Sequence, residues 1–361
     1  MNNNNRLISL DALKGFIMVV IAIDHCAYFV ARVHPYEYWG IVLPQYHGIL
    51  PFLTRSITHI CAPGFFFLMG IGIILFAENR RQKGWSEKQI IKHFALRGLL
   101  LICVQLFIEN PAWFIGLKTS NVSYNLSRIP GGNGQVFLFF GVLFGLGAAM
   151  MVCSLLLRSK RLLLLLIGIV CILGSQVLLP GAENVKILYS PLLRLLLVAG
   201  QTHFFQVTYP LIPWLGIAVL GMFFAKELLR NRESARKKIF ISGSLFLVLF
   251  FVIRTIGGFG STHSPQPGWI GFFNVTKYPP SLVFILITLG INLLLLFVLE
   301  KINLGKIAKP LLTFGRTAFF FYILHLYLYA IIGILFPNGV KILWMYPIWA
   351  VGLFILYPLC R

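Results

Sequence analysis

Apolar stretches long enough to cross a lipid bilayer fill most of the chain, and short polar connections separate them. A membrane-spanning helix needs about 20 mostly apolar residues, and it is apolar on every side, so helical periodicity adds little. The pattern predicts an all-α polytopic membrane protein with about ten transmembrane helices in one bundle. The stretches, one of them short, cover residues 12–32, 52–77, 92–110, 134–157, 162–179, 209–228, 238–256, 280–299, 311–336 and 342–359.

The composition narrows the class of protein. Of the 361 residues, 58% are hydrophobic and 11% are charged, whereas soluble domains carry about 25% charged residues. This excludes a soluble enzyme, and the high hydrophobicity excludes an intrinsically disordered chain. We see no repeat, long linker or signal-peptide cleavage pattern, so we expect a single domain over residues 1–361. The six cysteines are scattered, without the close spacing of a metal or redox site.

Basic residues fall in alternate connections and orient the predicted helices. The chain has 31 Lys and Arg against 10 Asp and Glu. By the positive-inside rule the more basic side is cytoplasmic, so both termini are predicted to be cytoplasmic. The same charge attracts anionic lipid headgroups, whereas no basic and aromatic module indicates a nucleic-acid partner. The predicted cytoplasmic side holds 19 of the 31 basic residues, at Arg6, Arg361 and connections 78–92, 158–161, 226–238 and 300–310.

A few titratable residues are predicted to lie inside the membrane. Asp24 is the carboxylate expected deep within a span, where insertion costs about 2.5–3.5 kcal/mol. The adjacent His25, and His59, Arg254 and His325 in three other stretches, share this environment. At 1.5 Å per residue, Asp24, His59 and His325 reach one level in the outer half of the bilayer. We therefore expect Asp24 to pair with His25, His59, His325 or Arg254.

Several interpretations of these titratable residues at one depth in the bilayer remain open. An imidazole takes a proton from a hydroxyl or an amine near neutral pH, so a His base with Asp24 as its partner suits group transfer. The same groups suit the proton path of a transporter, or a polar clamp between helices. A metal site is disfavoured, because the candidate ligands share no helix at spacings of three or four residues.

Three basic residues are predicted in the inner half of the bundle. Lys14, Arg97 and Arg316 each lie within about two turns of a cytoplasmic helix end. They are candidates for holding the phosphates of a cytosolic donor such as coenzyme A. The alternative is that these side chains extend to lipid phosphates.

Other candidates lie near the predicted outer helix ends. Trp214 and Lys277 belong to proline-rich segments that open the sixth and eighth stretches. Tyr and Trp at such positions are typical of the aromatic belt at the membrane surface. The alternative is that Trp214 and Lys277, together with Arg254, line the mouth of a substrate site.

The opening of the chain resembles the first helix of a superfamily of transmembrane acyltransferases, with Asp11, Lys14 and Gly15 followed by Asp24-His25. An ordered set of motifs resembles the heparan-alpha-glucosaminide N-acetyltransferase catalytic-domain family, especially its short bacterial members. A more distant similarity connects the chain to membrane O-acyltransferases of envelope polysaccharides. The motifs lie at residues 6–15, 58–70, 209–216, 277–281, 314–316 and 321–325.

The resemblance implies an integral-membrane acyltransferase with acetyl-CoA as the donor and no metal. The acceptor would be a sugar amine or hydroxyl of an envelope glycan or glycolipid on the extracytoplasmic side. It also implies a multi-pass protein of the bacterial inner membrane, with homo-oligomerisation left open. The alternative function is a proton-coupled transporter or flippase that uses Asp24 and the intramembrane histidines.

The resemblance also assigns roles to residues. In the polysaccharide O-acyltransferases a His follows the motif Asp by 14 residues, and counting from Asp11 this position is His25. In the lysosomal acetyltransferase the catalytic His falls in the following luminal segment, where this chain has His34 and His47. The base is therefore expected to be His25 or His47. Asp24, His59 and His325 would complete the catalytic pocket.

Overall fold

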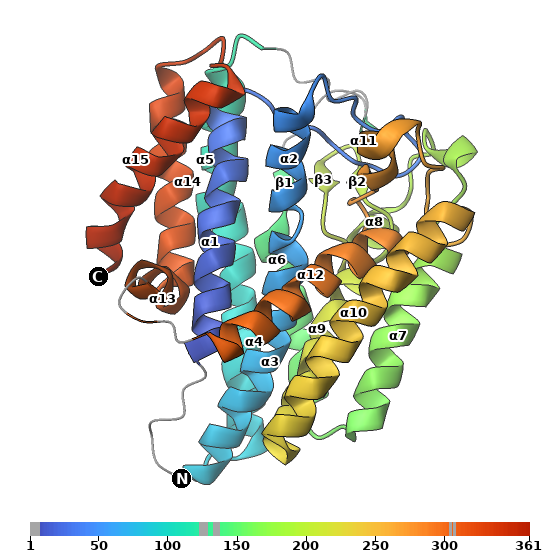
Figure 1. The fold of residues 1–361 in the computed structure, drawn as a ribbon, viewed down its shortest axis with the longest axis vertical. Helices are drawn as coiled ribbons and strands as arrows, with labels where there is room; N and C mark the ends of the chain where they lie inside the picture. The colour runs from blue at the N-terminus through green and yellow to red at the C-terminus, as the bar shows by residue number, and fades with distance from the viewer. Residues whose placement is uncertain (1–7, 123–128, 133–137, 303–304, 306–307) are drawn as a thin grey trace.

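The computed structural model describes residues 8–122, 129–132, 138–302, 305 and 308–361, and helices dominate them. Most helices run along the long axis of the molecule, while loops and a small sheet gather at one end (Figure 1). The longer helices are α1 (Ile8–Phe29), α3 (Cys61–Gln82), α4 (Glu87–Val104), α9 (Leu211–Arg230), α10 (Arg232–Ile256), α12 (Leu282–Lys301), α14 (Ala318–Ile334) and α15 (Ile342–Cys360).

Shorter elements complete the bundle. The short helices are α2 (Ile49–Thr58), α5 (Asn110–Lys118), α6 (Val142–Leu155), α7 (Arg161–Val177), α8 (Pro191–Leu196), α11 (Gly268–Phe273) and α13 (Lys309–Arg316), with a π-helical turn at Gln105–Glu109 and a 3-10 turn at Ala182–Asn184. Strands β1 (Leu138–Phe140), β2 (Gly200–Gln201) and β3 (Phe205–Val207) form a sheet in the order β1-β3-β2. β3 pairs in parallel with β1 and antiparallel with β2.

The predicted class, a polytopic helical membrane protein, is confirmed, but ten spans are not. In the described part of the chain, seven helices are long and apolar enough to cross a membrane, or eight if one bent pair counts as a span. Each predicted stretch contains helix, but the stretch 134–157 also contains strand β1. However, the stretches 134–157 and 162–179 contain α6 and α7, which have only 14 and 17 residues. Residues 134–137 and Arg6 lie outside the described residues.

The predicted ninth span, 311–336, is wrong as a single helix. It consists of α13 and α14, which meet at 95°. α13 instead lies across α1, where the two backbones touch at Gly15 and Gly315. A Cβ atom on Gly15 would overlap the carbonyl oxygen of Leu311, and one on Gly315 would overlap that of Asp11. The hydropathy of the sequence did not indicate this change of direction between α13 and α14.

The predicted third span, 92–110, is too short. A continuous helical segment of 32 residues runs over Glu87–Lys118 and passes through the π-helical turn. Pro111 stands in the first turn of α5, where its missing N–H is tolerated. Glu109 therefore lies inside a helix, and Asp24 is not the sole carboxylate within a spanning segment.

The helix connections separate into two ends. The connections α3–α4, α6–α7 and α9–α10, which carry three of the four basic clusters, lie together at the bottom of Figure 1. The loops around α2, α8 and α11 lie at the opposite end. The cytoplasmic location of the basic end stays a prediction of the positive-inside rule.

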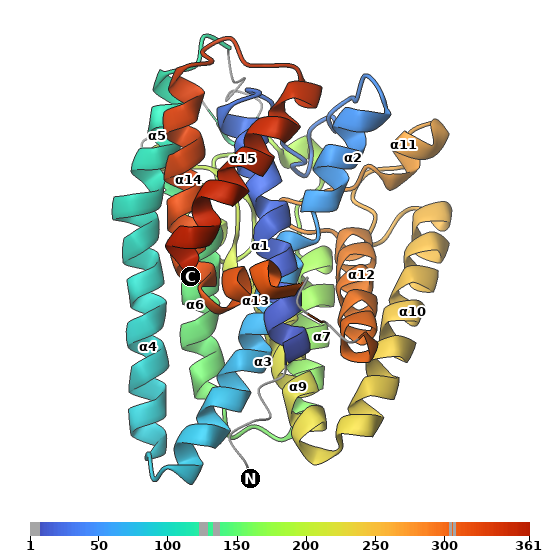
Figure 2. The same cartoon turned by 60° about the vertical axis from the view of Figure 1, so that its left-hand side comes forward.

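Helix α1 occupies the centre of the bundle. It lies between α4, α14 and α15 on one side and α10 and α12 on the other (Figure 2). Two hydrophobic clusters meet along it: one includes Ile17 and Phe66, and the other includes Met18 and Phe321. The polar residues of α1 are thus held between two packed cores.

Candidate active site

His25 on α1 and His325 on α14 are in direct contact. His25 Nδ1 lies 2.7 Å from His325 Nε2, and the two rings stack with centroids 4.9 Å apart. His325 Nδ1 lies 2.9 Å from the carbonyl oxygen of Phe321. A carbonyl only accepts, so this partner assigns the proton of a neutral His325 to Nδ1 and leaves Nε2 as an acceptor. His25 then donates through Nδ1 and keeps the lone pair on Nε2.

Aromatic side chains and a small pocket surround this histidine pair. The rings of Trp113 and Tyr322 meet the His25 ring edge-on, with centroids 5.2 Å and 5.8 Å away. His25 and Asp24 line a central pocket of about 90 Å³. Among the described residues no hydrogen bond to His25 Nε2 is formed, so this atom is available as a base.

Asp24 pairs with a residue that the sequence analysis missed. Its Oδ1 lies 2.6 Å from Arg55 Nη1 and accepts a hydrogen bond of 3.1 Å from the Thr58 hydroxyl. The expected pairing with His25, His59, His325 or Arg254 is therefore wrong. Arg55 lies inside the predicted stretch 52–77, so the available signal was a buried cation in an apolar run.

Arg55 also holds the outer loop onto the helices. Its Nε and Nη2 bind the two carboxylate oxygens of Glu37 at 2.8 Å and 2.7 Å, and Nη2 also donates to the Pro35 carbonyl. His59 Nε2 lies 3.5 Å from Glu37 Oε1. Burial alone would raise the pKa of Glu37, but the Arg55 guanidinium holds that pKa well below its ordinary value. The carboxylate is therefore ionised, and the loop is fixed to α2.

Glu109 is a second carboxylate on the central pocket. Its Oε1 accepts hydrogen bonds from Trp113 Nε1 at 2.9 Å and from the Tyr322 hydroxyl at 3.0 Å. Trp113 and Tyr322 are the side chains that flank His25. The sequence analysis missed Glu109 because the helix was predicted to end beside it.

Lys277 and His34 also reach the central pocket from the loops. Lys277 is buried, with Nζ 5.1 Å from the ring centre of Tyr278. His34 is half-buried, and burial together with the charge of Arg55 lowers its pKa to about 4. His34 is thus neutral at pH 7.

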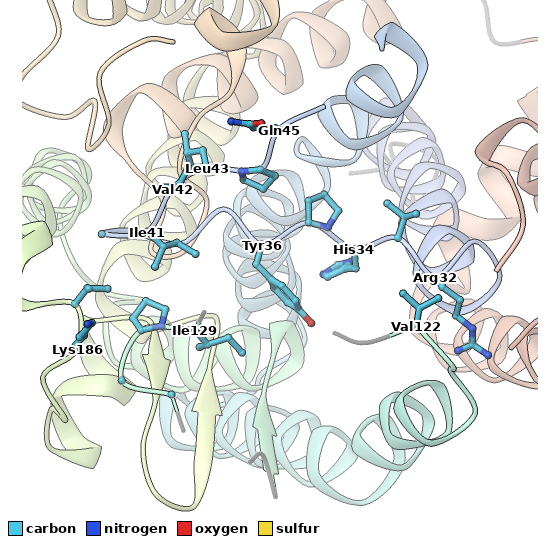
Figure 3. A pocket seen from close by; sticks show the side chains of 18 residues that line it. Arg32, His34, Tyr36, Ile41, Val42, Leu43, Gln45, Val122, Ile129 and Lys186 are labelled. Carbon is cyan, nitrogen blue, oxygen red and sulfur yellow. The ribbon is translucent and has the colours of Figure 1, made fainter. Parts of the chain in front are cut away.

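Three cavities follow one another through the molecule. An outer cavity of about 1230 Å³ shares His34 and Tyr36 with the central pocket, and Figure 3 shows these two side chains on one segment beside it. An inner cavity of about 340 Å³ contains Lys14 and Arg97 and shares Tyr322 with the central pocket, together with Phe65 and Val142. His25 therefore lines the central one of three neighbouring cavities.

Other predicted residues lie away from His25. His47 is exposed in the connection before α2 and lines none of these cavities. Arg254 is fully buried and donates to the carbonyls of Phe272 and Asn274 and to the Ser261 hydroxyl, which ties the end of α10 to the following loop.

Trp214 and Arg316 also take other positions. Trp214 is fully buried against Phe66 and Tyr209, so it does not face lipid. Arg316 is exposed, with Nε 3.6 Å from Asp11 Oδ2, and Lys14 Nζ lies 3.8 Å from Asp11 Oδ1. Asp11 thus draws Arg316 toward Lys14 at the inner cavity. Within the described residues no group of three or more metal-ligating side chains occurs.

The sequence matches a known catalytic family over most of its length. The family described as "Heparan-alpha-glucosaminide N-acetyltransferase, catalytic" covers residues 6–255. The heparan-alpha-glucosaminide N-acetyltransferases of Homo sapiens and Mus musculus are each 28% identical, over 126 and 127 residues. These alignments cover 35% of this chain but only 16% and 17% of the two relatives. Lys277 and His325 lie beyond the matched family region.

Proposed function

This chain belongs to the heparan-alpha-glucosaminide N-acetyltransferase catalytic family, and we propose from this premise that it is a membrane acetyltransferase. It moves an acetyl group from acetyl-CoA to an amine or hydroxyl of a sugar acceptor. The observation that carries the proposal is the series of cavities, which has His25 at its centre. A donor and an acceptor entering from opposite sides would meet at this histidine.

His25 acts as the general base of the transfer. Its Nε2 takes a proton from the acceptor while the acceptor nitrogen or oxygen attacks the thioester carbonyl carbon. The C–S bond then breaks, and the coenzyme A thiolate takes this proton from the imidazolium. His325 accepts the Nδ1–H of His25 at 2.7 Å, which fixes the tautomer and the ring orientation. Asp24 braces α1 through Arg55 and does not contact the base.

Lys277 assists at the acetyl end of acetyl-CoA, and the basic residues of the inner cavity assist at its phosphates. The buried ammonium group of Lys277 lines the pocket and would stabilise negative charge on the carbonyl oxygen during attack. Lys14 and Arg97, with Arg316 nearby, suit the phosphates of coenzyme A. The apolar walls of the inner cavity, among them Met18 and Phe94, suit its pantetheine arm.

The proposed cellular setting follows from charge and family. The basic end faces the cytoplasm, where acetyl-CoA is found, and the outer cavity faces the opposite side. We place the protein in a bacterial inner membrane with an envelope glycan or glycolipid as the acceptor. The protein is then a multi-pass enzyme that carries an acetyl group across the bilayer.

Acetyl-CoA binding and slow hydrolysis by the purified protein in detergent test this function. Wild type is compared with His25→Ala and with a control, His203→Ala, whose side chain is exposed. We expect micromolar binding by the wild type and loss of hydrolysis only in His25→Ala. Normal hydrolysis in that variant would remove His25 as the base. No binding at millimolar donor, with flux driven by a pH gradient, would instead support the transporter.

A further inference from the structure

Arg32 is a buried cation that the proposed reaction does not use. It lies three residues after the end of α1 and is 3% exposed. In the part of the chain that the structure describes, it forms no ion pair with a carboxylate. Its φ of 57° is in the left-handed region, which residues other than glycine adopt only where the surroundings hold them. Both the charge and the backbone of Arg32 therefore need an explanation.

The guanidinium group of Arg32 binds the ends of two helices. Nη1 donates to the Gly116 carbonyl at 2.8 Å, and Nη2 donates to the Gly333 carbonyl at 2.6 Å. Nε donates to the Phe336 carbonyl at 3.1 Å, and Nη2 also donates to the carbonyl and the hydroxyl of Thr119 at 3.3 Å and 3.1 Å. Gly116 and Thr119 are at the C-terminal end of α5, and Gly333 and Phe336 are at that of α14. The last carbonyls of a helix carry the negative end of its dipole, so they suit a cation.

These two helices carry side chains that surround the proposed base. Trp113 is on α5 and His325 is on α14, about one and two helical turns from the carbonyls that Arg32 binds. The Trp113 ring meets the His25 ring with centroids 5.2 Å apart, and His325 Nε2 lies 2.7 Å from His25 Nδ1. Arg32 itself continues the backbone of α1, which carries His25. One guanidinium group therefore connects the three helices that meet at the base.

We propose that Arg32 is a positioning residue for the His25 base. It fixes the ends of α5 and α14 against α1 and so holds His325 and Trp113 in contact with the His25 ring. A guanidinium group suits this task better than an ammonium group, because its planar set of five N–H donors reaches carbonyls of both helices at once. The inference rests on the proposed acetyltransferase function, in which His325 sets the tautomer of His25.

Kinetics of acetyl-CoA hydrolysis, which need no acceptor, test this role. We expect Arg32→Ala to lower kcat at least tenfold and to change KM for acetyl-CoA less than threefold, because the basic residues of the inner cavity keep their places. Arg32 also lines the outer cavity, so guanidinium ion can enter the space that the variant leaves. Added at a concentration that does not unfold the protein, this ion should restore part of the lost kcat.

Arg194→Ala is the matched control for loss of a buried guanidinium group. Arg194 is fully buried and also donates to carbonyls, those of Ile187 and Ala199. It lines none of the three cavities. We expect its melting temperature to fall as well, but its kcat to fall less than threefold. Equal losses of kcat in Arg32→Ala and Arg194→Ala would overturn the positioning role.

A double variant shows whether Arg32 acts through His325. Two residues that act through one another give effects that do not add. His325→Ala alone should lower kcat, and Arg32→Ala added to it should lower kcat less than threefold further. Losses that multiply in the double variant would overturn the proposal, because Arg32 would then act independently of the histidine pair.

Cross-linking measures the same geometry without acetyl-CoA. In a protein with His25→Cys and His325→Cys, dibromobimane should bridge the two thiols, and peptide mass spectrometry assigns the bridge among the native cysteines. Adding Arg32→Ala should lower the yield of this bridge at least threefold, whereas adding Arg194→Ala should not. Arg32→Lys, which keeps the charge with fewer donors, replaces Arg32→Ala in both experiments if size-exclusion chromatography shows that the alanine variant is not folded.

The two experiments separate the positioning role from the function on which it rests. Wild-type kcat or a wild-type yield of the bridge in the folded Arg32 variant would overturn the positioning role. A wild type that neither binds nor hydrolyses acetyl-CoA would refute the proposed function. The cross-linking yield would still decide whether Arg32 holds α14 against α1.

Discussion

Arg55 bridges Asp24 and Glu37, so one buried guanidinium connects α1, α2 and the outer loop. A buried charge that loses its partner is costly, because neither water nor another ion replaces the lost interaction. Removal of Arg55 would leave the buried carboxylates of Asp24 and Glu37 without their cation. The residues that build the site thus depend on a cation that touches neither histidine.

We predict that Arg55→Ala lowers the free energy of unfolding by about 3–5 kcal/mol, because it breaks a buried ion network. Thermal unfolding of the purified protein in detergent measures this. Arg230→Ala, at an exposed helix end, serves as the control. A melting temperature for Arg55→Ala equal to that of the control would show that the network contributes nothing.

Stability should also depend on pH through His34. Burial, with Arg55 nearby, lowers the pKa of His34 to about 4 from an ordinary value of 6.5. The unfolded chain then binds more protons than the folded one between these values, so stability falls as pH falls from about 6.5 to 4. We expect the melting temperature of His34→Gln to fall less than that of the wild type as the pH is lowered across this window. The same slope in both proteins would exclude His34 as its source.

Residue-level reasoning anticipated part of the site. Asp24, His25, His59 and His325 were recognised because a titratable group in an apolar run is costly. Glu37 was missed because it lies in a loop, where a carboxylate needs no explanation. Its burial depends on Arg55, and only the packing of α2 against the loop reveals that contact.

At the scale of elements, the crossing of α1 and α13 fixes where α14 begins. Gly15 and Gly315 let the two backbones touch, and α14 turns away from α13 by 95° to carry His325 toward His25. The sequence predicted apolar helices correctly, because hydropathy reports burial in lipid or core. It did not predict the break near Thr317, because the polar interruption at Arg316 and Thr317 is only two residues long and apolar residues flank it on both sides.

Gly315→Ala should disturb this crossing. The new Cβ would overlap the backbone of Asp11, and overpacking of this kind costs about 1–3 kcal/mol. We expect a lower melting temperature and reduced acetyl transfer, because α14 would shift with His325. Gly174→Ala on α7 is the matched control, since its Cβ would meet no atom within 4 Å. A melting temperature of Gly315→Ala equal to that of the wild type would show that the two helices accommodate a Cβ atom at their crossing.

At the scale of the whole molecule, the uneven distribution of basic residues and the row of three cavities both run from one end of the molecule to the other. The connections α3–α4, α6–α7 and α9–α10, three of the four basic ones, gather at one end (Figure 1), and the inner cavity contains Lys14 and Arg97. The outer cavity opens among the loops of the other end and contains Lys186 and His34 (Figure 3). Alternating charge predicted the two ends, but not the cavities, because these form between helices distant in sequence.

A substitution of Arg97 tests whether the donor binds in the inner cavity. If it binds phosphates of the donor, Arg97→Ala should reduce kcat/KM for acetyl-CoA about tenfold, since one charge-assisted hydrogen bond contributes about 1.5 kcal/mol. S-acetylpantetheine, which lacks the nucleotide and its phosphates, should show almost no change. Lys92→Ala, exposed on the same helix, controls for loss of surface charge. Equal losses with both donors would show that Arg97 does not act through the donor phosphates.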